Sequence, residues 1–204
     1  MELYDSEEQQ VEAIKDWWKE NGKAIIFGAV IGLGGLFGWR YYQDSVTAAQ
    51  EAASESYTQA VQELAAKGAD AEGRVQSFID ENSDTQYAVL AALQLAKVQV
   101  EAGSFDEALA QLEWAKTSTT DQALLAVIHY RLARVKAEQS DFDGALTELT
   151  NISDESWAGR VAELRGDVLL RKGDSQGAYA AYTEAQQSGD ASQTLQMKLD
   201  DLAK

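Results

Sequence analysis

The residue types that most often carry out catalysis are scarce in this chain. It contains no cysteine and a single histidine, His129. Without cysteine there is no thiolate nucleophile, no disulfide and no cysteine-based zinc site. The sequence places no nucleophile or orienting carboxylate around His129, which one imidazole would need for acid–base or nucleophilic chemistry. We therefore expect no catalytic residues, no cofactor and no enzymatic activity.

Two short motifs look like ligand sites but fail on their spacing. Residues 141–144 (Asp-Phe-Asp-Gly) begin like a calcium-binding loop, yet the third acidic ligand and the final glutamate are not in register. Residues 32–38 are rich in glycine, but Phe37 stands where a dinucleotide-binding loop needs its third glycine, and no strand precedes them. The acidic motif is better explained as a turn between two helices. We expect no metal site.

The charge balance of the chain is strongly acidic. Its 17 basic and 34 acidic side chains give a formal net charge of −17. Nucleic-acid binding rests largely on clustered Lys and Arg that neutralise phosphates, so a nucleic-acid partner is not expected. Two interpretations of the acidic surface stay open: a solvated surface that keeps the protein soluble, or one that attracts a basic partner in a salt-sensitive way.

Residues 24–39 form an apolar run without a charge. As a helix this run is about 24 Å long, and with residues 40–42 it approaches the ~30 Å hydrocarbon thickness of a bilayer. A cleaved signal peptide is the competing interpretation, because residues 46–48 (Val-Thr-Ala) have suitable small-residue spacing. The preceding tail is too long and too acidic for a signal peptide, so we predict an uncleaved transmembrane helix over residues 24–42.

Basic residues on either side of this segment predict its orientation. Lys15, Lys19 and Lys23 precede it, whereas Arg40 follows it. Because Lys and Arg concentrate on the cytoplasmic side, we expect residues 1–23 to form a cytoplasmic tail and the larger part of the chain to be exported. The chain is thus expected to cross the membrane once; a bacterial inner membrane, with the C-terminal domain in the periplasm, fits the lack of cysteine but is not required by it.

The tail shows a helical pattern of its own. Val11, Ile14, Trp17 and Trp18 share one side of a helix, and residues 21–22 (Asn-Gly) predict its end. This pattern is typical of a short amphipathic helix at the inner membrane surface, with the tryptophans at the interface. Binding of a cytoplasmic partner by the tail is the alternative.

Three glycines within the apolar segment follow helical i, i+4, i+7 spacing. Gly28, Gly32 and Gly35 would form a smooth strip along the transmembrane helix, where a neighbouring helix can approach closely. Glycine is also common in membrane helices in general, so the spacing leaves a second interpretation open. We take these three residues as the candidate membrane-helix contact.

Beyond residue 44 the apolar residues recur with helical periods, interrupted by Gly or by Ser/Asp-rich turns. Ala108, Ala145 and Ala178 occupy matching places, 37 and 33 residues apart, which brackets the 34-residue tetratricopeptide period. The predicted fold is therefore all-α: a single N-terminal transmembrane helix followed by a short tetratricopeptide-like α-solenoid. Residues 43–85 are expected to form a stem with flanking helices, and residues 86–204 the repeats with a C-terminal capping helix. Turns are expected at Gly68 and at residues 103–104, 118–121, 140–141, 173–174 and 188–190.

Four segments carry a resemblance that runs nearly end to end. They are residues 20–23 (Glu-Asn-Gly-Lys), 38–41 (Gly-Trp-Arg-Tyr), 131–135 (Arg-Leu-Ala-Arg-Val) and 164–174 (Leu-Arg-Gly-Asp-Val-Leu-Leu-Arg-Lys-Gly-Asp). In segment order and topology the chain resembles the YfgM family of ancillary subunits of the bacterial Sec translocon. The resemblance implies association with SecYEG and with the membrane-anchored periplasmic chaperone PpiD, and assistance to exported client chains that emerge from the channel.

Short arrays of helix pairs usually bind partners on the concave surface formed by their first helices. From the phase of the repeat, the candidate partner-binding groove consists of Gln94, Lys97, Gln99, His129, Arg131 and Arg134. The repeat scaffold and the scarcity of catalytic residues favour a non-enzymatic scaffold that binds a partner or client chain, and the resemblance implies that it does so at the export channel. The alternative is a membrane-anchored regulator whose cytoplasmic tail binds a signalling protein.

Overall fold

The computed structural model describes residues 7–188 and 192–202, and within them the chain is helical and contains no strand. The all-α prediction is thus confirmed. The chain divides into two compact units, residues 1–52 and residues 53–204. The helices are α1 (Glu7–Lys67), α2 (Glu72–Glu81), α3 (Gln86–Glu101), α4 (Phe105–Thr117), α5 (Gln122–Glu138), α6 (Phe142–Thr150), α7 (Ala158–Lys172), α8 (Ser175–Gln186) and α9 (Leu195–Leu202), with 3-10 turns η1 (Gly68–Ala71) and η2 (Glu155–Trp157).

The described part of the first unit is one helical segment, the N-terminal part of α1. The predicted end of a tail helix at residues 21–22 is wrong, because α1 continues through Asn21 and Gly22 into the apolar run. Two local contacts support this continuity. The Asn21 side chain donates a hydrogen bond to the carbonyl of Trp17 (3.0 Å), and the Trp18 indole lies against Gly22. A helix also keeps its backbone hydrogen bonds internal, as a segment entering a membrane must.

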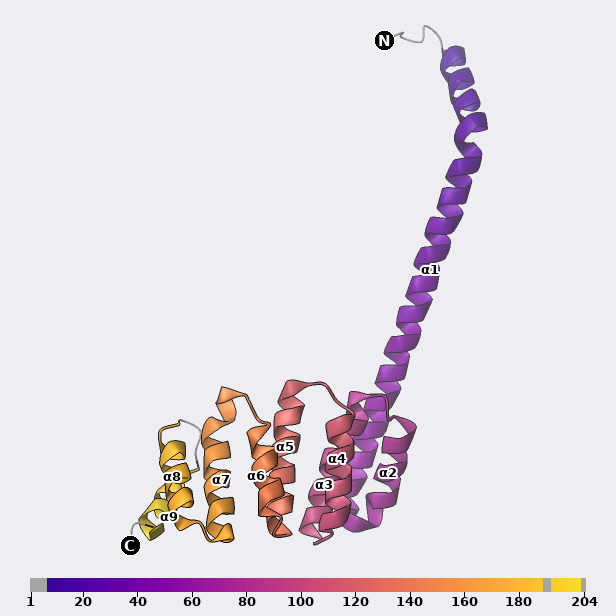
Figure 1. The fold of residues 1–204 in the computed structure, drawn as a ribbon. Coiled ribbons are helices and arrows are strands. Elements are labelled where there is room, and N and C mark those ends of the chain that lie inside the picture. Colours follow the sequence, from indigo (N-terminus) through magenta and orange to yellow (C-terminus); the bar gives the residue numbers. More distant parts are fainter. Residues whose placement is uncertain (1–6, 189–191, 203–204) are drawn as a thin grey trace. The chain divides into compact units, whose positions relative to one another are not determined.

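The second unit is an array of helix pairs that follow one another in chain order (Figure 1). Helix α3 packs against α4, α5 against α6 and α7 against α8, and each pair also contacts the next. The predicted turns coincide with helix ends, although Gly189 and Asp190 of the last one lie outside the described residues. Ala108, Ala145 and Ala178 are fully buried, each in the second helix of its pair. The predicted repeat is thus confirmed.

The chain reverses between the two helices of each pair at one equivalent residue. Gly103 (φ 81°), Ser140 (φ 65°) and Gly173 (φ 95°) all adopt the left-handed conformation. Glycine adopts this conformation readily, whereas a residue with a Cβ does so at a cost of roughly 1–2 kcal/mol. The middle turn is therefore the strained one of the three.

Aspartates that follow two of these turns cap the next helices. Asp141 accepts a hydrogen bond from the backbone N–H of Gly144 (3.0 Å) at the start of α6. Asp174 accepts one from the N–H of Gly177 (2.8 Å) at the start of α8. Such caps satisfy backbone donors that a helix start otherwise leaves unpaired. The motif that begins like a calcium loop is thus part of a helix cap.

Close packing joins α7, α8 and α9 at the C-terminal end of the array. Gly166 of α7 lies so near the Tyr182 ring of α8 that a Cβ at residue 166 would overlap it. Tyr182 is buried, and its hydroxyl donates a hydrogen bond to Asp167 (2.7 Å). Helix α9 packs on α8 and buries Leu195 and Leu199 in the same apolar cluster. Helix α9 therefore covers apolar surface that α8 would otherwise expose.

Candidate functional site

In the first unit the candidate membrane-helix contact lies on an uncovered helix surface. Beyond their own helix, Gly28, Gly32 and Gly35 have no neighbour within 4 Å of the place that a Cβ would take. Around them, Phe27 and Ile31 are 70% and 72% exposed. In the described part of the chain, one helical stretch is long and apolar enough to cross a membrane, and it lies near the N-terminus. An apolar surface of this extent needs lipid or another helix to cover it.

In the second unit three adjacent hollows run along the first helices of the pairs. The hollow between the last part of α1 and α3 has a volume of about 480 Å³, that between α3 and α5 about 420 Å³, and that between α5 and α7 about 360 Å³. Lys97 and Glu101 line both the first and the second hollow. Arg134 and Glu138 line both the second and the third. The three hollows together are named the groove below.

Four of the six predicted groove residues line this groove. Gln94 and Lys97 line the first hollow, and Lys97, Arg131 and Arg134 line the second. Arg131 is half-buried and donates a hydrogen bond from Nη1 to the carbonyl of Leu93 (2.9 Å). Burial and the neighbouring charge of Arg134 lower the pKa of Arg131 below its ordinary value. The structure therefore brings the three predicted cations of the groove to one hollow.

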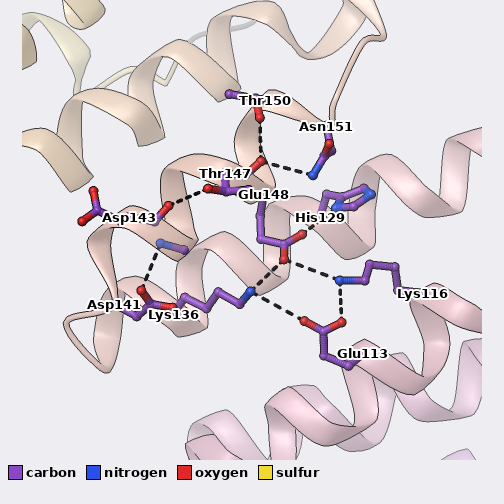
Figure 2. Close-up of polar contacts among 11 residues, drawn as sticks. Glu113, Lys116, His129, Lys136, Asp141, Asp143, Thr147, Glu148, Thr150 and Asn151 are labelled. Atoms are coloured by element: carbon purple, nitrogen blue, oxygen red, sulfur yellow. Dashed lines mark hydrogen bonds and ion pairs between the residues drawn. The ribbon is translucent and has the colours of Figure 1, made fainter.

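The other two predicted residues, Gln99 and His129, do not line the groove hollows. Gln99 is buried and donates a hydrogen bond to Glu72 (3.2 Å), while its Oε1 has no hydrogen-bond partner among the described residues. The Nδ1 atom of His129 lies 2.7 Å from Glu148 Oε2 (Figure 2). Each lies two residues from a groove residue along its helix. At about 100° per residue, its side chain points about 200° away from that groove residue around the helix axis.

Glu148 of α6 is the centre of a polar network that joins three helices (Figure 2). It is 5% exposed. Its carboxylate forms ion pairs with Lys136 of α5 (2.8 Å) and Lys116 of α4 (3.5 Å), and it also contacts His129. Glu113 of α4 pairs with both lysines. Burial alone would raise the pKa of Glu148, but hydrogen bonds with Lys136 and His129 and the charges of the lysines lower it. The network joins the first two helix pairs by charge.

The sequence analysis missed this network, although one signal was present. Glu148 lies three residues after the buried Ala145 and one before the buried Leu149, so helical periodicity places it on the apolar side of α6. A carboxylate in such a place needs cationic partners. Its lysines come from positions 12 and 32 residues away, which the pattern within α6 does not reveal.

The matches to known proteins cover residues of both units. The profile of the tetratricopeptide repeat-like domain matches residues 15–204. The ancillary SecYEG translocon subunit of Escherichia coli (strain K12) is 41% identical to this chain over the full length of both. The protein of the same name from Haemophilus influenzae is 37% identical and covers 96% of this chain and 97% of its own length.

The chain belongs to the family of ancillary SecYEG translocon subunits. The resemblance that the sequence motifs carry is thereby confirmed, and the protein has a Sec-associated role. As a member of this family whose described residues contain one candidate membrane span, it is a single-pass membrane protein.

Solved structures show the same fold as this translocon-subunit family member. Pseudomonas aeruginosa pilF matches with a TM-score of 0.60 and 16% identity, over 75% of this chain and 68% of its own. A tetratricopeptide repeat protein from Parabacteroides merdae matches with a TM-score of 0.58 and 16% identity, over 73% of this chain and 60% of its own. The likeness concerns the fold, and the tetratricopeptide-like prediction is confirmed.

Proposed function

We propose that this chain is a non-enzymatic scaffold subunit of the bacterial inner membrane. Residues 24–42 cross the membrane, residues 1–23 stay in the cytoplasm, and the repeat unit stands in the periplasm. There it binds a PpiD-like membrane-anchored chaperone and assists client chains that emerge from the Sec channel. The observation that carries the proposal is the full-length 41% identity to a translocon subunit, which spans the anchor and the repeats alike. The lysines before the apolar segment support the orientation.

The mechanism that fits a membrane anchor joined to a repeat unit is tethering of the repeat unit beside the channel. A repeat unit held beside the channel exit meets its partner at an effective concentration of about a millimolar, so weak binding by the groove suffices. The open surface at Gly28, Gly32 and Gly35 would let a helix of the translocon approach the anchor closely. Lys97 and Arg134 of the groove are exposed to a partner. These surfaces fit a role in binding rather than in bond making.

Photocrosslinking in native membranes tests the proposal. A photoreactive residue at Gly28 or Gly35 is expected to form adducts with SecYEG, and one at Lys97 with the chaperone or with exported chains. Val30 and Phe37 are the matched control positions, because they are similarly exposed and lie on the opposite side of α1. Adducts to this chain only, or equal adducts from both sides of the helix, would contradict the proposal.

The proposed orientation has a separate test, which the lack of cysteine makes simple. The single substitutions Glu12→Cys and Ser175→Cys introduce thiols at exposed positions before and after the anchor. In intact spheroplasts a membrane-impermeant maleimide should label the protein substituted at residue 175. The protein substituted at residue 12 should react only after permeabilisation. The reverse labelling pattern would refute the orientation.

A further inference from the structure

The groove contains two arginines without a counter-ion. Arg131 donates its hydrogen bond to a neutral carbonyl, that of Leu93 (2.9 Å), and Arg134 is exposed. In the part of the chain that the structure describes, neither forms an ion pair with a carboxylate. Their like charges repel each other across one turn of α5. Two adjacent cations without a carboxylate partner, one of them half-buried, form a positively charged site that an anionic group can neutralise.

The pairing of neighbouring carboxylates leaves Arg134 unpaired. Lys97 and Arg134 are equivalent residues of the first two pairs, 37 positions apart on α3 and α5, whereas the 33-residue step to the third pair places Asp167 at this position of α7. Lys97 pairs with Glu101, four residues further along its helix (3.7 Å). Glu138 is the equivalent partner of Arg134, but it pairs with Arg171 of the next repeat (2.9 Å). Within the described structure, Lys97 thus has a carboxylate partner and Arg134 has none.

Arg131 adds a second cation at this place in the middle pair only. The equivalent residues are Gln94 in α3, 37 positions earlier, and Leu164 in α7, 33 positions later. A guanidinium has five N–H donors, and one of those of Arg131 is used for Leu93. Arg131 and Arg134 are three residues apart on α5 and line the same 420 Å³ hollow. At this spacing both side chains can reach one anion.

The other residues of the hollow decide which anion fits. Apolar side chains contribute to its lining from three helices, namely Ala96, Val100, Leu112 and Val135. Glu101 and Glu138 also line it, and their charges repel an anion of high charge such as a phosphate. A singly charged carboxylate next to an apolar side chain satisfies both features.

We propose that this hollow binds a peptide segment of a partner protein in which a carboxylate lies next to an apolar side chain. The carboxylate binds Arg131 and Arg134, and the apolar side chain packs on Val100, Leu112 and Val135. This site rests on the proposed scaffold function, because it names the chemistry that the groove selects in its partner. Local charge thus differs from net charge: an acidic chain presents a site for an acidic ligand.

Peptide binding to the full chain in zwitterionic nanodiscs tests the site. The probes are two fluorescently labelled pentapeptides blocked at both ends, Ala-Leu-Glu-Leu-Ala and the same peptide with Gln at its centre. Anisotropy titrations should show about tenfold tighter binding of the Glu peptide at low salt. High salt should reduce this preference, because Arg134 is exposed and its charge is screened.

Arginine variants assign the preference to the site. Arg131→Gln/Arg134→Gln should reduce the affinity of the Glu peptide to that of the Gln peptide. Arg165→Gln/Lys172→Gln is the matched control, since it removes two ion-paired cations from α7 outside this hollow and should change nothing. Arg134→Glu changes only an exposed residue, so it should fold. It therefore tests the site even if the double variant fails to fold. It should reverse the preference toward a third peptide with Lys at its centre.

Three outcomes would overturn the site: equal affinity for the Glu and Gln peptides, no binding of either at about 1 mM, or a preference unchanged by the substitutions at Arg134. Co-purification of SecYEG with the unmodified chain tests the proposed function separately. A chain that co-purifies with SecYEG but shows no peptide preference would refute the carboxylate site and leave the scaffold function standing.

Discussion

Glycine serves opposite purposes in the two units of this chain. In the first unit, Gly28, Gly32 and Gly35 face space that no other described residue fills. In the second unit, Gly166 lies so close to Tyr182 that even a methyl group overlaps the ring. A missing side chain therefore leaves room for another molecule in one unit and for the fold's own packing in the other. The glycines of the first unit thus have no packing partner among the described residues, whereas Gly166 of the second unit packs against a helix of the same unit.

Charged residues follow the same division. The Asp16–Lys19 ion pair of the first unit has side chains that are 74% and 77% exposed. Glu148 of the second unit is 5% exposed and has three cationic or basic partners. Water screens the first pair strongly and the second network weakly. Substitutions in the two units should therefore differ in size, and some should differ in sign.

The largest effect is expected from Glu148→Gln. The substitution keeps the shape but leaves Glu113 as the remaining carboxylate for Lys116 and Lys136. The free energy of unfolding should fall by about 2–3 kcal/mol, because both lysines are partly buried. The matched control is Asp16→Asn, with an expected change below about 0.5 kcal/mol. Urea unfolding of the full chain in detergent, followed by circular dichroism, measures both, and equal effects would refute the contrast.

Acid should destabilise the second unit through Glu148 and Glu163. Burial raises the pKa of Glu163, but hydrogen bonds from Ser192 and Lys198 outweigh it, so both carboxyls have lowered pKa values in the folded chain. Such a group stabilises the fold above its unfolded pKa, and this contribution is lost as the pH falls through its folded pKa. The free energy of unfolding should therefore change little from pH 7 to about 5 and then decline. Glu148→Gln should decline less steeply than the wild type, and parallel curves would exclude Glu148 as a cause.

A smaller effect with a diagnostic sign is expected from Gly166→Ala. In an open helix this change is stabilising by about 1 kcal/mol. Against the Tyr182 ring, overlap should outweigh that gain and lower the free energy of unfolding by about 1–2 kcal/mol. Gly28→Ala and Gly35→Ala, where space is open, should leave unfolding of the second unit unchanged. Stabilisation by Gly166→Ala would disprove the close packing of α7 on α8.

The sequence predicts features that depend on local patterns and on period. The three buried alanines at positions 108, 145 and 178 follow from spacing, because each repeat needs a small residue where its helices approach. The end predicted at residues 21–22 was wrong for a local reason. Asn-Gly is a stop signal in isolation, but here the Asn21 side chain bonds back to Trp17 and the helix continues.

The candidate site was predictable in part for the same reason. Lys97, Arg131 and Arg134 share the phase of the first helices and line one hollow, as the phase suggested. Gln99 and His129 lie two residues out of that phase and face other partners. The pairing of Glu138 with the next repeat, which leaves Arg134 free of a carboxylate, depends on how α5 and α7 pack. A single repeat's sequence does not contain that information.

The smallest expected effect is a gain in stability from Ser140→Gly. Ser140 adopts the left-handed conformation (φ 65°) that Gly103 and Gly173 occupy in the other two pairs. Removing the Cβ relieves roughly 1–2 kcal/mol of strain, and the greater freedom of glycine in the unfolded chain returns part of it. The free energy of unfolding should therefore rise by about 0.5–1 kcal/mol. Ser140→Ala keeps the Cβ and should give no such gain, so equal stabilisation by both substitutions would assign the effect to the lost hydroxyl instead of the backbone. Gly173→Ser is the reverse substitution at the equivalent turn. It should lower the free energy of unfolding by a similar amount if the backbone conformation, and not the neighbouring residues, sets the energy of these turns.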